Sequence, residues 1–173
     1  EMKHTLLIIT ALMLVVGCGS DSIKLDINNL IDRGGLMYAP NDDEPFTGIV
    51  FDFYENGEKK LDGNYRKGLM NGKWTDWYEN GQKSSEGTFK DGKQDGLWTW
   101  WYENGQIREQ GSYINGDGSY PDYYDDFPDE IRKEIPPFGG RNGKWTYWYG
   151  DGQKRSEGTF KDGKQDGLWT WWY

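Results

Sequence analysis

The stretch GQKSSEGTFKDGKQDGLWTWWY occupies residues 81–102 and returns at residues 152–173 with one difference, Arg155 at the place of Ser84. A Tyr closes each copy, and the same Tyr marks a series along the chain. The series is Tyr54, Tyr78, Tyr102, Tyr149 and Tyr173, with spacings of 24, 24, 47 and 24 residues. A fixed period near 24 predicts a stack of supersecondary units, each packed on its neighbours.

Each unit contains two turn signals. The first is an Asn-Gly or Asp-Gly pair after the Tyr, at 56–57, 80–81, 104–105 and 151–152. These pairs suit the two positive-φ positions of a type I′ turn, which joins the strands of a β-hairpin. Trp, Tyr, Phe and Thr between the turns favour strands, and the frequent Gly disfavours helices. We therefore expect β-hairpins, each followed by a second, looser turn at Asp-Gly.

The composition predicts an unusual core. Hydrophobic residues make up 35% of the chain, whereas globular domains have about 45–50%. The chain instead has 10 Trp, 12 Tyr and 7 Phe, which suit rings stacked from one hairpin to the next. The predicted fold is all-β, an elongated and essentially single-layer meander of antiparallel hairpins. A net charge of −9 argues against nucleic acid as the partner.

The first residues resemble a lipoprotein signal peptide. Lys3 supplies a basic start, a largely apolar run follows over 6–16, and small residues precede Cys18. This run is too short for a membrane-spanning helix. Cys18, the only cysteine, is either an incidental apolar residue of the signal or, as we favour, the residue that is acylated after cleavage at 1–17. Gly19 and Ser20 indicate the outer rather than the inner membrane by resemblance to enterobacterial sorting.

The expected domain organisation follows. Residues 18–29 form a tether and residues 30–173 form the repeat domain. Within it the repeats lie near 48–70, 71–95, 96–116 and 142–166, with a partial repeat at 167–173 and an insertion near 117–141. The partial repeat predicts either a truncated sequence, which we favour, or an exposed edge strand at the end.

A family resemblance rests on two stretches. The opening RGGLMYAPNDDEPFTG at 33–48 and the repeated WYENGQKxSEGTFKDGKxDGLW resemble the variant MORN repeat of bacterial proteins in the set labelled YwqK-type antitoxins. The resemblance covers 30–173 except for the insertion. It implies an antiparallel hairpin array, no known catalytic residues or cofactor, and a protein partner such as a toxin.

The insertion is rich in Asp, Tyr, Pro and Gly and has three interpretations. It is a solvated surface excursion, a calcium site, or a recognition loop. The calcium ligands would be Asp117, Asp122, Asp125, Asp126 and Asp129, but their spacing does not match an EF-hand and metal is the less favoured hypothesis. As a recognition loop, the insertion would offer Tyr120, Tyr123 and Tyr124 to a partner.

Two tryptophan ladders are expected on opposite faces, because alternate strand residues point to opposite sides. One comprises Trp74, Trp98, Trp145 and Trp169. The other comprises Trp77, Trp101, Trp148 and Trp172, and these are our candidates for partner binding. Either the rings serve only as the core, or one ladder forms a binding face for a protein or for sugar rings.

No enzymatic function is expected. The single histidine, His4, lies in the signal peptide, which excludes His-dependent triads from the mature chain. Glu86, Glu109 and Glu157 recur with the repeat and are interpreted as solvated cross-strand partners of Lys. We predict a lipid-anchored scaffold for a protein partner at the cell envelope. Carbohydrate or peptidoglycan binding is the alternative, and a cytosolic toxin neutraliser requires an unused signal.

Overall fold

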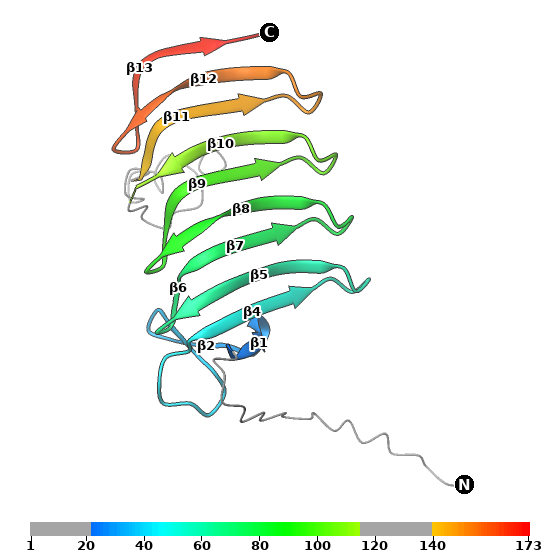
Figure 1. Ribbon diagram of the computed structural model, residues 1–173, viewed down its shortest axis with the longest axis vertical. Coiled ribbons are helices and arrows are strands. Elements are labelled where there is room, and N and C mark those ends of the chain that lie inside the picture. The colour runs from blue at the N-terminus through cyan, green and yellow to red at the C-terminus, as the bar shows by residue number, and fades with distance from the viewer. Residues whose placement is uncertain (1–21, 115–139) are drawn as a thin grey trace, which may run out of the picture.

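The computed structural model describes residues 22–114 and 140–173 (Figure 1). In these two ranges nearly every element is a strand, with one short 3-10 turn, η1. The elements are β1 (Lys24–Asp26), η1 (Ile27–Asn29), β2 (Ile31–Arg33), β3 (Leu36–Tyr38), β4 (Gly48–Phe53), β5 (Lys59–Arg66), β6 (Leu69–Met70), β7 (Gly72–Trp77), β8 (Lys83–Lys90), β9 (Lys93–Trp101), β10 (Ile107–Tyr113), β11 (Arg141–Trp148), β12 (Lys154–Lys161) and β13 (Lys164–Trp171).

One open sheet of 11 strands dominates the structure. From β4 onward its strands follow chain order and pair antiparallel, except that the short β6 pairs with β5 off this path, so each hairpin lies directly on the preceding one (Figure 1). Only β1 is parallel to its neighbour, β4. The small hairpin β2–β3 forms a separate two-stranded sheet at the first end. The prediction of an elongated, essentially single-layer hairpin array is confirmed.

The predicted turn types were wrong, because the two turn signals exchange roles. In the Asn-Gly turns only the Gly has positive φ, for example 81° at Gly81, while Asn80 does not. Tyr78 and Gln82 close this loop over three residues, which gives a type I turn followed by a glycine bulge. The Asp-Gly turn instead has two positive values, 49° at Asp91 and 81° at Gly92, and is the tight type I′ turn.

The start of the described chain packs against the first hairpin. β1 lies within the stretch expected as a tether, yet it pairs with β4, and Leu25 and Ile27 contact the core cluster. The side chain of Asp26 caps η1 by accepting a hydrogen bond from the Asn28 backbone N–H at 2.8 Å. Residues 24–29 therefore close the otherwise exposed edge of β4.

The core is a row of aromatic rings on one face of the sheet, here called the aromatic face. Successive rings meet mostly edge to face, with centroids 5.0 to 6.3 Å apart. The row is Phe46, Tyr65, Trp74, Phe89, Trp98, Trp100, Tyr113, Trp145, Phe160 and Trp169. Trp145 is fully buried, although no second layer covers the sheet in the described ranges. Rings from neighbouring repeats provide the apolar surroundings that a second layer supplies in a sandwich.

A glycine in the preceding hairpin makes room for the first tryptophan that each of the next strands adds to this row, namely Trp74, Trp98, Trp145 and Trp169. A Cβ added at Gly87 would lie only 2.1 Å from the nearest indole atom of Trp98, and one at Gly111 would lie 2.1 Å from that of Trp145. Gly63 and Gly158 have the same relation to Trp74 and Trp169. The indole therefore lies directly on the backbone of the neighbouring strand, which explains why a Gly recurs at this position.

Polar contacts at the turns join the repeats a second time. The first four tyrosines of the register series each donate a hydrogen bond from the hydroxyl to a Trp carbonyl of the next repeat. The pairs are Tyr54–Trp77 at 2.7 Å, Tyr78–Trp101 at 2.7 Å, Tyr102–Trp148 at 2.9 Å and Tyr149–Trp172 at 3.0 Å. The amide of Asn80 likewise donates to the carbonyl of Glu103 at 2.8 Å. The register tyrosine thus fixes the spacing of successive turns.

The insertion leaves the sheet register intact. Tyr113 pairs with Arg141, and the Ile114 N–H donates to the Gly140 carbonyl at 2.8 Å. Strands β10 and β11 are therefore neighbours in the sheet on either side of the insertion. The insertion takes the place that the Asp91-Gly92 turn has in the preceding repeat.

We predict that Gly87→Ala destabilises the fold by about 1–3 kcal/mol, because the new methyl group overlaps the Trp98 ring. Gly150→Ala is the matched control, since nothing lies within 4 Å of its added Cβ and its φ is not positive. Urea unfolding followed by tryptophan fluorescence measures both. Equal stability of the two variants would contradict the packing described here.

Candidate functional site: the lysine face

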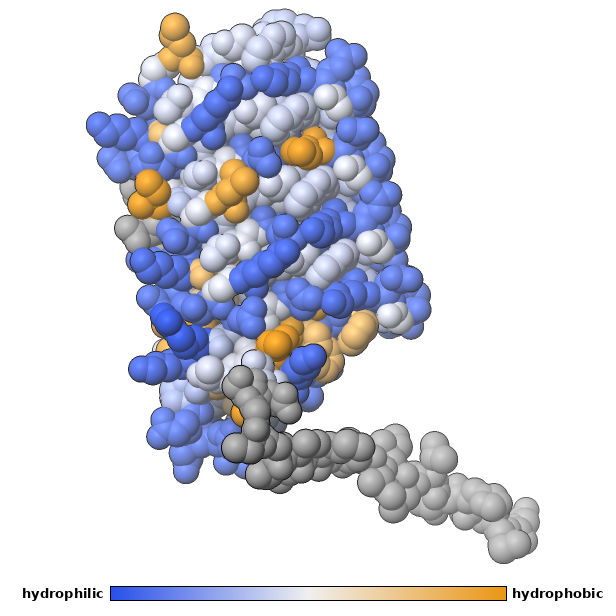
Figure 2. Space-filling view, in the orientation of Figure 1, coloured by the Kyte–Doolittle hydropathy of each residue, from blue (hydrophilic) through white to orange (hydrophobic). Residues whose placement is uncertain are grey.

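The opposite face of the sheet carries charged side chains and the second tryptophan ladder. In β7 the strand alternation places Lys73, Thr75 and Trp77 on this side, away from buried Trp74. Glu86 of β8 is paired with Thr75 in the ladder. We call this side the lysine face. Figure 2 shows hydrophilic stripes across one broad face of the sheet, with hydrophobic residues as isolated spots between them.

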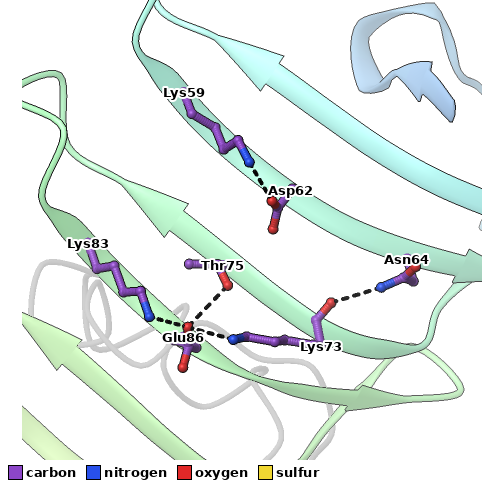
Figure 3. Close-up of polar contacts among 7 residues, drawn as sticks. All are labelled: Lys59, Asp62, Asn64, Lys73, Thr75, Lys83 and Glu86. Carbon is purple, nitrogen blue, oxygen red and sulfur yellow. Dashed lines mark hydrogen bonds and ion pairs between the residues drawn. The ribbon is translucent and has the colours of Figure 1, made fainter.

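Glu86 is the centre of one charged cluster, the first triad, formed by Lys73, Lys83 and Glu86. Its carboxylate contacts the Lys83 ammonium and lies 3.0 Å from that of Lys73 (Figure 3). Thr75 donates a further hydrogen bond to Glu86 at 3.4 Å. Both ammonium groups remain accessible, since the Lys73 and Lys83 side chains are 65% and 42% exposed. The triad therefore presents a net positive charge to solvent.

The same cluster recurs two repeats later as the second triad, formed by Lys144, Lys154 and Glu157. The Glu157 carboxylate lies 2.7 Å from both ammonium groups and accepts a hydrogen bond from Thr146 at 3.2 Å. The prediction that Glu86 and Glu157 are cross-strand partners of Lys is confirmed. They are less solvated than expected, with exposures of 27% and 22%.

The triads shift the pKa of their carboxyls. Hydrogen bonds from Lys144 and Lys154 lower the pKa of Glu157 to about 2. For Glu86, partial burial acts to raise the pKa, but the hydrogen bonds and charges of Lys83 and Lys73 outweigh it, so that this pKa is also lowered. Both carboxylates are therefore ionised at neutral pH, and each triad is held together by charge.

Glu109 does not belong to this series, and its interpretation as a solvated partner of Lys was wrong. It aligns with Ser85 and Ser156 on the aromatic face, where it is 5% exposed and lies 3.2 Å from Arg108. The position equivalent to Glu86 is Gln110, which pairs with Thr99. Glu109 was mistaken for a member of the series because the third repeat has the sequence EQG at 109–111, whereas its neighbours have SEG, so its glutamate comes one position earlier.

Two further carboxyls lie on the aromatic face in the first two repeats. Burial raises the pKa of Asp76, although Ser85 and Trp74 donate hydrogen bonds to it at 2.6 and 3.3 Å. A hydrogen bond from Lys60 lowers the pKa of Asp52, with a carboxylate to ammonium distance of 2.9 Å. The later repeats have Trp100 and Tyr147 at this position, so the aromatic row widens along the sheet.

Lysines partly cover the second tryptophan ladder. Lys59, Lys83 and Lys154 place their ammonium groups over Trp77, Trp101 and Trp172, at 4.9, 5.8 and 5.6 Å from the ring centroids. Such contacts are typical cation–π interactions. Trp77, Trp101 and Trp148 are half-buried, and Trp172 is 39% exposed. The four candidate tryptophans therefore share one face, but most of their area is not free.

The third repeat lacks the triad. Where its neighbours have two lysines and a glutamate, it has Leu97, Ile107 and Gln110. Gln110 donates a hydrogen bond to Thr99 at 2.9 Å, so the cross-strand bond persists without the charge. Leu97 is 58% exposed. Our interpretation of the sequence missed this uncharged break, although aligning the repeats position by position reveals it.

Several predicted residues lie outside the described ranges. These are Cys18, the tyrosines Tyr120, Tyr123 and Tyr124, and the five aspartates proposed as calcium ligands. Within residues 22–114 and 140–173 no group of three or more His, Cys, Asp or Glu is arranged to hold a metal ion. The same ranges contain no helix that is long and apolar enough to cross a membrane.

Comparison with protein families supports the repeat assignment. The model of the MORN repeat variant matches residues 70–91, 94–115 and 141–162. Three hairpins of this chain match the MORN repeat variant. Each match covers one hairpin, namely β7–β8, β9–β10 and β11–β12. A search of curated proteins found no match. The MORN hairpins thus include both triads and the uncharged repeat between them.

We expect Glu157→Gln to weaken the pH dependence of stability in acid. Because folding lowers this pKa from about 4.3 to about 2, the carboxylate stabilises the protein above about pH 4.3, and this contribution is lost as the pH falls towards 2. The variant should therefore be less stable than wild type at pH 7 and equally stable near pH 2. Urea titrations across this range measure the difference.

Glu79→Gln, at an exposed turn, is the control for removing one negative charge. Gln is compatible with the fold at position 157, because the third repeat has Gln110 at the equivalent position. A stability gap for Glu157→Gln that stays constant down to pH 2 would contradict the charge-based account.

Proposed function

We propose that this protein is a non-enzymatic, lipid-anchored repeat scaffold that binds a protein partner at the cell envelope. The observation that carries the proposal is the lysine face, a broad side of the MORN array on which charged side chains repeat at fixed positions. An open sheet with one packed face and one accessible face suits the binding of a macromolecule better than the enclosure of a small substrate. The family resemblance suggests a toxin as this partner, but the scaffold function does not require the partner to be a toxin.

The lipid anchor in this proposal is Cys18. The preceding segment has the three regions of a lipoprotein signal, and acylation of Cys18 would place the repeat domain at a membrane surface. Two or more acyl chains are needed for stable attachment, since a single chain binds only marginally. The residues after Cys18 favour the outer membrane.

The lysine face favours a protein partner over a glycan. Sugar rings stack on bare aromatic faces, whereas Lys59, Lys83 and Lys154 lie over three of the four candidate tryptophans. Charged rows with apolar spots between them are typical of protein interfaces that use charge for specificity. Peptidoglycan binding remains the competing hypothesis, and it requires these lysines to move aside.

We predict that the full-length protein incorporates radiolabelled palmitate in bacterial cells and fractionates with membranes. Cys18→Ala should abolish both, because it removes the acceptor thiol. Cys18 is the only cysteine, so a labelled wild type identifies the site directly. An unlabelled, soluble wild type would contradict the anchor and restore the cytosolic toxin neutraliser as the better hypothesis.

Cross-linking and affinity purification of the tagged full-length protein from its host test the partner class. We expect wild type to enrich one protein. A folded variant with Trp77 and Trp101 both replaced by Ala should recover less of it. Enrichment of glycan fragments without a protein would favour the peptidoglycan hypothesis.

A further inference from the structure

The feature that the scaffold function leaves unexplained is the coordinated loss of charge in the third repeat. Three positions change together, from Lys73, Lys83 and Glu86 to Leu97, Ile107 and Gln110. These positions lie on the lysine face. In the preceding repeat their three residues form one charge network. Leu97 remains 58% exposed there, so it gains little from burial within this chain. The replacement creates what we call the neutral notch, defined by Leu97, Ile107 and Gln110.

The notch lies between the two triads. The chain order of the sheet places β9 and β10, which form the notch, between β8 of the first triad and β12 of the second. Four strand spacings separate Glu86 from Glu157, which is about 19 Å. Each triad has two lysines and one glutamate, so a neutral and apolar centre is flanked on both sides by net positive charge.

The position of Ile107 adds apolar surface to the notch. Lys83 and Lys154 lie over the tryptophan of the following repeat, at Trp101 and Trp172. Ile107 has the equivalent position, and the tryptophan of the repeat that follows it is Trp148. An aliphatic side chain thus has the repeat position that a lysine has in the neighbouring repeats, and the tryptophan that corresponds to it, Trp148, is half-buried.

From this arrangement we propose that the neutral notch and its two flanking triads form the partner-binding site, and that the partner presents an acidic amphipathic helix. The inference rests on the scaffold function proposed above and specifies its partner. A helix rises 1.5 Å per residue, so two carboxylate groups about 13 residues apart reach both triads. Apolar side chains between them then contact Leu97, Ile107 and Trp148. A helix suits a sheet face because it presents side chains along one stripe.

Charge favours this partner over an anionic membrane. Glu86 and Glu157 lie between the lysines of their triads, and the protein as a whole carries a charge of −9, which is repelled by a broad negative surface. A discrete helix can place its carboxylates at the four exposed lysines only. Because the neutral notch has a charged triad on each side, it also fixes where along the helix the apolar side chains must lie.

The direct test restores the missing triad. Leu97→Lys, Ile107→Lys and Gln110→Glu together give the third repeat the residues of its neighbours, so the variant should fold. The probe is a fluorescein-labelled synthetic helix with Leu at its centre and Glu at both ends, about 13 residues apart. We expect micromolar binding to wild type, at least tenfold weaker binding to the triple variant, and marked weakening at 0.5 M NaCl.

Two matched controls accompany it. Leu168→Lys changes the equivalent leucine of the last repeat, which is 95% exposed and outside the notch, and should leave binding unchanged. A probe with Lys in place of Glu should not bind wild type. Equal binding of the triple variant, or equal binding of both probes, would overturn the proposal.

Other occupants give different results. Binding of wild type to phosphatidylglycerol vesicles that the triple variant loses would assign the site to a membrane surface instead. Dimerisation in sedimentation experiments that the triple variant loses would assign it to a second copy. A cellular partner recovered equally by wild type and triple variant would refute the notch but keep the scaffold function. Recovery of no protein by wild type would refute the scaffold function itself.

Discussion

The contact on which the rest of the structure depends is the packing of an indole ring on the backbone of the preceding hairpin. Trp98 on Gly87 and Trp145 on Gly111 are two copies of it. The contact brings adjacent repeats close enough for their remaining rings to meet edge to face. Each such ring pair contributes about 0.5–1.5 kcal/mol beyond its buried area. Repeated along the sheet, it buries Trp145 completely without a second layer.

This arrangement determines how the two faces differ. Because the buried aromatic core lies on one face, the other face, apart from its half-buried tryptophan ladder, is free for residues that stabilise the sheet less. The lysine–glutamate triads contribute only modestly, since their lysines are largely exposed and exposed ion pairs are weak. The triads and the neutral notch can therefore vary between repeats without loss of the fold. Such freedom is what a repeat scaffold needs to acquire a specific partner.

Much of the fold could be predicted from the sequence because its determinants are local. The period of 24 residues, the alternation around Trp74 and Trp77 and the Gly-containing turns all follow from neighbouring residues. The turn types could not, because Asn80 and Asp91 both precede Gly and both tolerate positive φ. The type I turn with its bulge differs from the type I′ turn in the number of loop residues, and this number is fixed by the pairing of the two strands.

The candidate site was predicted in part. Alternation places Trp77, Trp101, Trp148 and Trp172 on one face, but it does not reveal that lysines from preceding hairpins lie over three of them. Those contacts join residues of different repeats. Glu109 was misassigned for a related reason, since a glutamate one position earlier in the repeat points to the opposite face. Position within the repeat, rather than residue type, decides which side of the sheet a charge occupies.

The most direct test of the two-faced sheet is hydroxyl-radical footprinting of the folded protein, with mass spectrometry reporting oxidation at each tryptophan. The account predicts slow modification of Trp74, Trp98 and Trp145, which are 7%, 3% and 0% exposed, and fast modification of Trp172, which is 39% exposed. Trp77, Trp101 and Trp148 should fall between these groups. Equal rates for Trp145 and Trp172 would contradict the packing of indole on glycine and the separation of the two faces.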